Sequence, residues 1–249
     1  MIGMMFEKVV KKFSAFVAGV VVYVIAGGLY LGAKGFVTDE TGNIMLMSQA
    51  HAKTEDATQK IIPQNFGFPQ DHVWGDSKAP VALYEYSSFG CFHCADFHLE
   101  VLPEIVQNYV EKGLLKVVFV PMPLDKNSMD AALLAECVES DKYFSFAELM
   151  FKKQRDWGLA FNPQKVLLQY AALSGVDNDK AEACLHNDVT AARILKDRKD
   201  GIDVLKISGT PSFFIASEKG VEIVEGIKSF DDFALIIDEH LADLKSAEK

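Results

Sequence analysis

The sequence predicts an α/β domain in which a helical block interrupts a small β-sheet, preceded by a transmembrane helix. Short apolar runs of strand length lie on both sides of a long middle stretch, and that middle stretch shows only helical periodicity. An uncharged stretch of bilayer length, which follows a lysine cluster near the N-terminus, predicts the leading helix. With 249 residues, 49% of them hydrophobic, the chain is long enough for one such domain and its appendages.

The N-terminal stretch has the composition of a membrane anchor. An uncharged run from Phe13 to Ala33 follows three lysines, Lys8, Lys11 and Lys12. As a helix the run would span about 31 Å, which matches the core of a bilayer. With the lysines kept on the cytoplasmic side of the membrane, the rest of the chain would lie on the outer side. A cleaved secretory signal is the alternative, although its apolar region usually has roughly 7 to 15 residues.

The rest of the chain divides into a tether and a folded domain. Residues 35–70 show no sustained apolar period and are expected to link the anchor or signal peptide over residues 1–34 to the domain. The domain is expected in three pieces: a first part over residues 71–127, a helical insert over 128–207, and a second part over 208–249.

Two strands and a helix are predicted in the first part of the domain. An apolar run from Val81 to Tyr86 reads as a buried strand. Apolar residues at three- and four-residue spacing then predict a helix that opens at Cys91 and stops before Gly113. A second buried strand follows at Leu115–Pro121.

The middle of the domain carries only helical signals. Apolar helical segments begin at Ala131, Tyr143 and Val166, and Asp177 and Asp188 are candidate N-caps for two more helices.

Strand-like sequence returns after the helical block. Runs at Ser212–Ala216 and Val221–Val224 predict two strands joined by a turn, and Phe230–Leu244 predicts a final amphipathic helix. The order is strand, helix, strand, helical block, strand, strand, helix. This order is that of a thioredoxin-like sheet with an inserted helical block.

Cys91 and Cys94 are predicted to be a redox pair. At a helix N-terminus, unpaired N–H groups and the helix dipole stabilise a thiolate, so the pKa of Cys91 should fall below the free value of about 8.5. Cys94 would be shielded one turn further in, and its reach back to Cys91 allows a reversible disulfide. A structural disulfide and a zinc site are the alternatives, but the second pair of ligands usual for zinc is missing.

Charge and cysteine usage restrict the class of protein. A formal net charge of −10 argues against nucleic acid as a partner. The two cysteines outside the redox pair, Cys137 and Cys184, are expected to form a structural disulfide, which suits an exported domain. Two buried free thiols are the alternative. None of the histidines at positions 51, 72, 98, 186 and 240 has a spacing that suggests a metal or triad site.

Two motifs resemble one known family over about Asp76 to Leu244. The motif Cys91-Phe92-His93-Cys94 is similar to the Cys-Pro-His-Cys of the DsbA-type thiol:disulfide oxidoreductases of the bacterial cell envelope, from which it differs at Phe92. The segment from Gly209 to Phe214, reading GTPSFF, looks like the family's cis-proline loop.

The resemblance implies a role for the proline loop. In the family, a cis peptide before the proline places the preceding residue's backbone against the reactive cysteine. Here this would be the Thr210–Pro211 bond, and the Thr210 N–H and C=O would pair with a substrate peptide. An ordinary trans-proline that opens a strand is the alternative.

Two charged residues in the predicted strands are further candidates. The family has an acidic residue at the position of Glu85, beneath the buried cysteine, and a lysine can lie close to it on the neighbouring strand. We therefore expect Glu85 and Lys116 to form a partly buried pair that helps move protons to and from Cys94. A solvent-facing Lys116 is the alternative.

The two residues between the cysteines are expected to tune the site. A charged His93 would stabilise the thiolate and make the disulfide form a stronger oxidant, whereas a neutral, solvent-facing imidazole would not. Phe92 keeps a backbone N–H where the family has proline, and it offers substrates an apolar face.

The resemblance implies an enzyme that introduces disulfide bonds into reduced exported proteins through the Cys91–Cys94 disulfide and a mixed disulfide on Cys91. It implies no bound cofactor or metal, a quinone-linked membrane oxidase as partner, and a place in the cell envelope. The catalytic domain would lie in the periplasm, anchored to the inner membrane or soluble if the signal is cleaved. A disulfide isomerase or reductase that uses the same site is the alternative, followed by a thiol-based metal-binding module.

Overall fold

The computed structural model describes residues 22–25, 28–31, 36–38 and 44–46, Ile62, and residues 66–247. By their internal contacts, these residues fall into two compact units, Met1–Ala57 and Thr58–Lys249.

The described residues of the N-terminal unit form four short strands. Strand β1 (Val22–Ile25) pairs antiparallel with β2 (Gly28–Leu31), and β3 (Phe36–Thr38) pairs antiparallel with β4 (Ile44–Leu46). The first pair lies within the predicted transmembrane helix, and the second lies within the predicted tether. Valine, isoleucine and tyrosine dominate β1, and these residues favour strands.

The remainder of the predicted transmembrane segment lies outside the described residues. Among the helices that the structure does describe, none combines the length and the apolar character needed to cross a bilayer.

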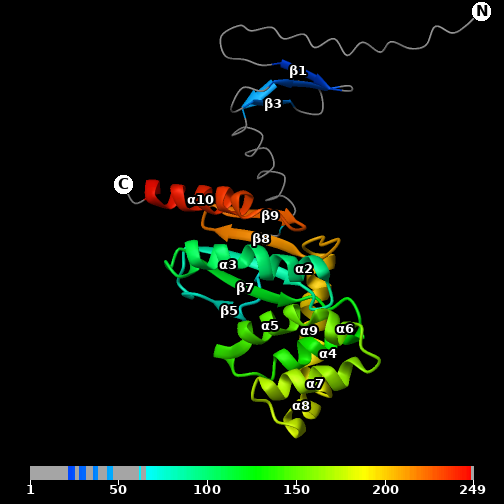
Figure 1. Cartoon of the computed structure of the whole chain (residues 1–249). Helices are drawn as coiled ribbons and strands as arrows, with labels where there is room; N and C mark the ends of the chain where they lie inside the picture. Colours follow the sequence, from blue (N-terminus) through cyan, green and yellow to red (C-terminus); the bar gives the residue numbers. More distant parts are fainter. Residues whose placement is uncertain are drawn as a thin grey trace, which may run out of the picture. The chain divides into compact units, whose positions relative to one another are not determined.

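A five-stranded sheet forms the centre of the second unit (Figure 1). Its order is β5 (Val73–Trp74), β7 (Leu115–Pro121), β6 (Val81–Ser87), β8 (Ser212–Ser217) and β9 (Gly220–Glu225). Strands β6 and β7 are parallel, and every other neighbouring pair is antiparallel. The four strands that the sequence predicts for the domain are confirmed, while the two-residue β5 was not foreseen.

One long helical segment connects β6 to β7. It consists of α2 (Phe92–Asp96), a π-type turn η1 (Phe97–Val101), α3 (Leu102–Ile105) and a second π-type turn η2 (Val106–Val110). Pro103 lacks an N–H and crowds the preceding turn, which accounts for the widened turn before it. Gly113, at φ +69°, reverses the chain into β7, as the predicted stop requires.

Helices fill the chain between β7 and β8. They are α4 (Lys126–Ala135), the 3₁₀ turn η3 (Ser140–Lys142), α5 (Tyr143–Lys152), α6 (Gln154–Gly158), α7 (Pro163–Leu173), α8 (Asn178–Leu185) and α9 (Asp188–Asp203). Asp177 caps α8 as predicted. The cap of α9 is Asn187, whose side chain accepts from the Thr190 N–H, so Asp188 is the first residue of that helix instead of its cap.

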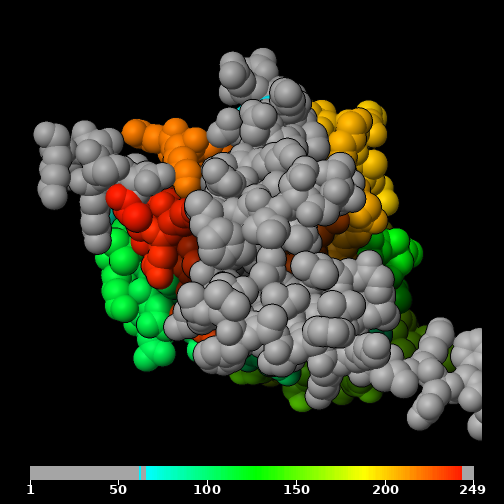
Figure 2. All heavy atoms as spheres, turned by 90° about the horizontal axis from the view of Figure 1, so that it is seen from above, coloured from blue at the N-terminus to red at the C-terminus, as the bar shows by residue number. Residues whose placement is uncertain are grey.

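The final helix, α10 (Phe230–Ala247), packs on the sheet beside β8, and Figure 2 shows it in red next to the orange β8–β9 segment. Phe233 and Ile237 of α10 share a core with Leu83 and with Phe97 of the long helical segment. Alternate residues of β6 point to the other face of the sheet, where Tyr84 and its neighbours pack with the end of α9. The sheet is therefore covered on both faces.

Candidate active site

Cys91 lies at the end of β6, where it is the N-cap of α2. Its backbone is extended (φ −87°, ψ 123°), and the Ala95 N–H donates to its carbonyl. The half-buried thiol has its pKa lowered to about 5, first by a hydrogen bond from the Cys94 thiol and then by backbone N–H groups of Cys94 and His93. These donors exist because the first turn of a helix leaves its N–H groups unpaired. Cys91 is therefore a thiolate at neutral pH.

Cys94 lies one turn further in and is fully buried. Burial raises the pKa of its thiol well above the ordinary range, and the hydrogen bond and charge of Cys91 and the charge of Glu85 add to this. Both cysteines are free thiols in the structure. One sulfur is thus exposed enough to react and charged, while its neighbour is shielded and protonated.

The loop before β8 lies against the reactive cysteine. The Thr210–Pro211 peptide bond is cis, as the sequence predicts. The Cys91 Sγ lies 3.3 Å from the Thr210 carbonyl oxygen, to which it donates as a thiol. Antiparallel pairing of β8 with β6, with Ser212 opposite Tyr86, holds the loop at the end of β6. This placement leaves the Thr210 backbone beside the sulfur that would react.

The two residues between the cysteines form the exposed rim of the site. The Phe92 side chain is 53% exposed, and the Arg155 guanidinium from α6 lies 5.6 Å from its ring centroid. His93 is also largely exposed, and its Nδ1 lies 3.6 Å from an Asp96 carboxylate oxygen. The rim therefore presents an aromatic ring, a cation and an imidazole to any chain that approaches Cys91.

Glu85 is fully buried on β6, but its partner is not the one that the sequence predicts. His98 Nε2 lies 2.9 Å from Glu85 Oε2, with 3% and 0% of the two side chains exposed. The Lys116 ammonium instead donates to the Ser77 carbonyl oxygen at 3.0 Å. The predicted Glu85–Lys116 pair is therefore wrong.

Strand register explains why Lys116 does not pair with Glu85. Glu85 is paired in register with Phe119, whereas Lys116 is paired with Ala82, three residues earlier on β6. Because successive side chains alternate between the faces of a sheet, positions 82 and 85 face opposite sides. Lys116 shares the face of Ala82, so it cannot reach the carboxylate of Glu85.

The contact between His98 and Glu85 was not predicted, because the histidine was considered only as a metal or triad residue and no spacing favoured either role. Its spacing from Cys94 does carry a signal. Four residues apart on a helix, the two side chains lie on the same face, so a buried Cys94 implies a buried His98.

Gln154 of α6 is a second residue that the sequence does not reveal. Its buried side-chain amide donates to the carbonyl oxygens of Phe89 at 2.7 Å and Cys91 at 2.9 Å. Both of its amide hydrogens are therefore used to hold the loop that carries the reactive cysteine. No sequence pattern marks such a contact between an insert and a distant loop.

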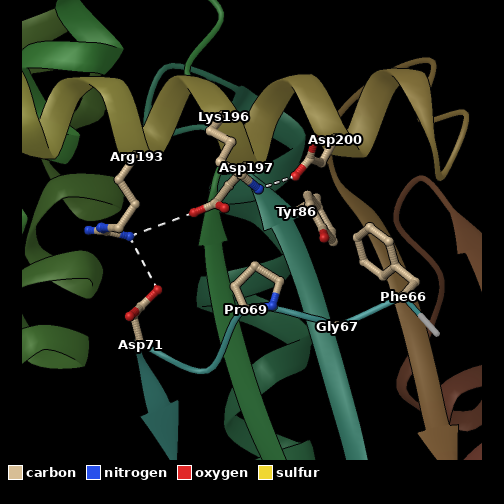
Figure 3. Close-up of a pocket in the computed structure, with 9 residues that line it drawn as sticks. All are labelled: Phe66, Gly67, Pro69, Asp71, Tyr86, Arg193, Lys196, Asp197 and Asp200. Atoms are coloured by element: carbon tan, nitrogen blue, oxygen red, sulfur yellow. Dashed lines mark hydrogen bonds and ion pairs between the residues drawn. The ribbon is translucent and has the colours of Figure 1, made fainter.

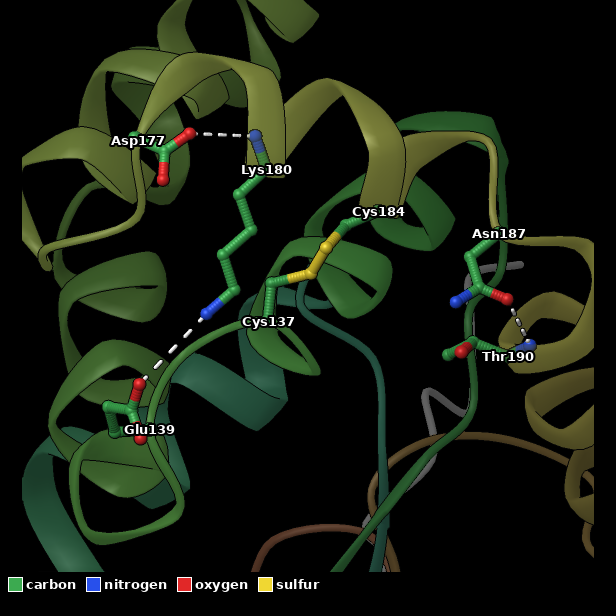
Figure 4. Close-up of a disulfide and its surroundings, with 7 residues drawn as sticks. All are labelled: Cys137, Glu139, Asp177, Lys180, Cys184, Asn187 and Thr190. Carbon is green, nitrogen blue, oxygen red and sulfur yellow. Dashed lines mark hydrogen bonds and ion pairs between the residues drawn. A yellow bond between two sulfur atoms is a disulfide. The ribbon is translucent and has the colours of Figure 1, made fainter.

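The other two cysteines form the disulfide that the sequence predicts (Figure 4). Cys137 follows α4 and Cys184 lies in α8, with their Cα atoms 6.3 Å apart and the two positions separated by 47 in sequence. An ion pair between Lys180 and Glu139, at 4.0 Å, joins the same two segments. The disulfide therefore ties the insert together without taking part in the redox pair.

A pocket lies on the other side of the sheet, between α9 and the segment that leads to β5 (Figure 3). Its charged residues are paired with one another: Arg193 contacts Asp71 at 3.3 Å and Asp197 at 3.7 Å, and Lys196 contacts Asp200 at 2.5 Å. These pairs leave little unbalanced charge for a ligand. Within the part of the chain that the structure describes, no cluster of three or more His, Cys, Asp or Glu side chains is arranged to hold a metal ion.

Comparison with known families and proteins gives a consistent result. A family model described as Thioredoxin matches residues 68–239. A relative from Rickettsia prowazekii, whose name places it among the protein-disulfide oxidoreductases, is 27% identical over 197 residues, which are 78% of this chain and 71% of the relative. The match to a relative of the same name from Rickettsia felis, at 28% identity, covers 72% of this chain and 63% of that protein. The disulfide bond formation protein D of Bacillus subtilis is 25% identical, covering 76% and 85% of the two chains.

Solved structures share the fold. The crystal structure of α-DsbA1 from Wolbachia pipientis has a TM-score of 0.69 and 28% identity, and the similarity covers 77% of this chain and 99% of that one. Oxidised BdbD from Bacillus subtilis has a TM-score of 0.62 over 71% and 97% of the two chains, and its 24% identity supports the fold alone.

Proposed function

The chain belongs to the thioredoxin family and, within it, to the DsbA-type protein-disulfide oxidoreductases, and from this premise we propose that it introduces disulfide bonds into exported proteins. The observation that carries the proposal is the contrast between the two sulfurs. Cys91 has a pKa lowered to about 5, and its reduced form is therefore stabilised as a thiolate. A couple whose reduced form is stabilised is a strong oxidant when it holds a disulfide.

The reaction would proceed in two exchanges. A substrate thiolate attacks the Cys91 sulfur of the Cys91–Cys94 disulfide, and Cys94 leaves as a thiolate that takes up a proton. A second substrate thiolate then attacks the substrate sulfur of the mixed disulfide, and Cys91 leaves as a thiolate. Two electrons pass from the substrate's thiols to the enzyme, and the substrate gains one disulfide.

The surroundings of Cys91 support roles for four neighbouring residues. The Thr210 carbonyl oxygen, 3.3 Å from the sulfur, lies where an extended substrate strand could pair with it beside Pro211. Phe92 and Arg155 would contact the substrate residue next to its cysteine. His93, when charged, would further stabilise the Cys91 thiolate.

The partners and place of the enzyme follow from the same premise. Its substrates would be reduced exported proteins, and a quinone-linked oxidase in the membrane would restore the Cys91–Cys94 disulfide. The lysine cluster and the uncharged run Phe13–Ala33 support attachment to the inner membrane, with the catalytic domain in the periplasm. Retention of the protein in membranes after carbonate washing supports attachment, whereas a soluble mature form that begins near His51 shows cleavage.

An oxidation assay tests the proposed function. The oxidised protein is mixed with an equal amount of a reduced peptide that has two cysteines, and the free thiols of both are followed. We expect the peptide to become oxidised as Cys91 and Cys94 become reduced. A protein that instead only reduces or reshuffles disulfides is a reductase or isomerase that uses the same site. A metal that remains bound after purification under reducing conditions, together with no exchange, would indicate a metal-binding module.

A further inference from the structure

An arginine of the helical insert is held beside the loop that carries the reactive cysteine. Arg155 belongs to α6, and the residue before it, Gln154, donates hydrogen bonds to the carbonyl oxygens of Phe89 at 2.7 Å and Cys91 at 2.9 Å. Because the Gln154 side chain is buried, these bonds fix α6 against that loop. The fold therefore sets where the backbone of Arg155 lies, while its side chain is exposed.

The guanidinium of Arg155 lies over the exposed ring of Phe92, the residue that follows Cys91. The central carbon of the guanidinium is 5.6 Å from the ring centroid, which is within the range of a cation–π contact. Proline, which the motif of the family has in place of Phe92, offers no such ring. The contact keeps the positive charge at the rim of the site and leaves the N–H donors of the guanidinium available for a carboxylate.

Other charged groups around the rim have partners, whereas Arg155 has none of its own. The paired groups on α5, α6 and α2 are Lys152 with Glu148, Lys153 with Asp156, and His93 with Asp96. Asp125, whose carboxylate lies close to Gly90, accepts hydrogen bonds from Ser128 as the cap of α4. Arg155 forms no ion pair or hydrogen bond with any residue that the structure describes. It therefore presents an unpaired positive charge beside Cys91.

We propose that Arg155 is a specificity-determining residue, which makes the enzyme prefer substrates with an aspartate or glutamate next to the reactive cysteine. A guanidinium can donate two parallel N–H bonds to one carboxylate, and Phe92 already holds this guanidinium at the rim. The proposal rests on the proposed function, because it concerns substrates of the same Cys91–Cys94 site. It adds a substrate class, namely exported proteins whose cysteines are flanked by acidic residues.

The charge of the whole chain would produce the opposite preference. A formal net charge of −10 repels acidic peptides and attracts basic ones, most strongly at low ionic strength. Without a local cation, the protein should therefore react faster with basic peptides than with acidic ones. A preference for acidic peptides needs a positive group close to Cys91, and Arg155 lies where it can supply one.

The test measures how fast an excess of single-cysteine peptides reduces the oxidised protein. Three peptides differ only in the residues that flank the cysteine, which are glutamate, glutamine or lysine. Flanking charge also changes the reactivity of the peptide's own thiol, so each rate is divided by the rate of the same peptide with Arg155→Gln. At low salt we expect this ratio to be roughly 3 or more for glutamate, about 1 for glutamine and below about 1 for lysine. Salt at about 1 M should bring all three ratios towards about 1.

Two further variants separate the place and shape of the cation from its charge. Lys165→Gln removes an exposed positive charge from α7 of the same insert, and it should leave the rates with all three peptides unchanged. Arg155→Lys keeps the charge but loses the planar group, so it should retain only part of the preference for glutamate. The pH dependence of Cys91 alkylation should be the same in every variant, because Arg155 is not among the groups that shift the pKa of Cys91.

The possible results distinguish this inference from the proposed function. A preference for glutamate that Arg155→Gln abolishes and Lys165→Gln leaves intact supports the proposal. Equal ratios for the three peptides, or the same loss of preference with Lys165→Gln, would overturn it while leaving the proposed function in place, because exchange still occurs. No exchange with any peptide would remove the proposed function itself, and the inference would fall with it.

Discussion

At the scale of single residues, the site depends on the different hydrogen bonding and burial of two cysteine side chains at one helix end. Cys91 receives hydrogen bonds from Cys94 and from the N–H groups of the first turn, whereas Cys94 is buried among aromatic rings. The same chemical group is therefore a thiolate in one position and a thiol in the other. The reactivity of each sulfur should follow from its position.

The first prediction concerns the different reactivities of Cys91 and Cys94. At pH 6, a thiol with a pKa of about 5 is about nine-tenths thiolate, so Cys91 of the reduced protein should be alkylated quickly. Cys94 should react slowly, because it is buried and protonated. Mass spectrometry after brief treatment with iodoacetamide identifies the modified residue. Modification of Cys94 before Cys91 would contradict the assigned roles.

The second prediction concerns the amide of Gln154. Replacing it with leucine removes the donors for the Phe89 and Cys91 carbonyls and leaves both without these partners. The free energy of unfolding should fall by roughly 1 to 3 kcal/mol, and the pKa of Cys91 should shift because the loop is held less firmly. Urea unfolding and the pH dependence of Cys91 alkylation measure the two effects. The matched control is Gln169→Leu in α7, an exposed glutamine of the same insert, which should change neither quantity.

At the scale of elements, a helical insert and a sheet share one site. The sheet supplies Glu85 and the Thr210–Pro211 loop, the long helical segment supplies both redox cysteines and His98, and the insert supplies Gln154. The insert is held together by its own disulfide, Cys137–Cys184. Loosening the insert should therefore affect stability first and redox chemistry second.

The third prediction tests whether the Cys137–Cys184 disulfide affects stability more than redox chemistry. A variant with alanine at positions 137 and 184 loses a link that closes a loop of 47 residues, which in the chain-entropy model stabilises the fold by about 4 kcal/mol. We expect its free energy of unfolding to fall by up to that amount, while the rate of Cys91 alkylation stays within about twofold. Peptide mapping of the native protein without reduction should recover the linked pair. Alkylation of both cysteines in the oxidised native protein would rule the disulfide out.

At the scale of the whole molecule, the charge of Cys91 couples redox state to stability. Hydrogen bonds from Cys94 and the first turn of α2 lower the folded pKa of Cys91 from its ordinary value to about 5. A group whose folded pKa is lowered contributes stability above its unfolded pKa and loses that contribution as pH falls through its folded pKa. Only the reduced protein has this group, because a disulfide does not titrate.

The fourth prediction follows from this linkage. The stability of the reduced protein relative to the oxidised protein should be greatest near pH 9 and should decline as the pH is lowered to 5. Cys94 does not alter the sign in this window, since its raised pKa keeps it a thiol throughout. Thermal unfolding of both redox forms across this range measures the difference. A gap between the two melting temperatures that is constant with pH would contradict a lowered Cys91 pKa.

Much of the domain could be predicted because its signals are local. Runs such as Leu115–Pro121 are apolar and β-branched over the whole length of a strand, and Gly113 marks the end of the preceding helix. The partner of Glu85 could not be predicted, because it depends on strand register and on which face of the sheet each side chain occupies. A membrane helix over Phe13–Ala33 was expected from a lysine cluster followed by an uncharged run of bilayer length. The structure describes the β1–β2 pair within this run, and apolar composition alone does not distinguish the two.

The equilibrium of the Cys91–Cys94 couple against a glutathione buffer tests the central claim most directly. The fraction of oxidised protein is measured across a series of ratios of reduced to oxidised glutathione at pH 7. A stabilised Cys91 thiolate predicts a reduction potential at the oxidising end of the range, near about −120 mV. A potential near about −270 mV would mark the protein as a reductase and would contradict the proposed function.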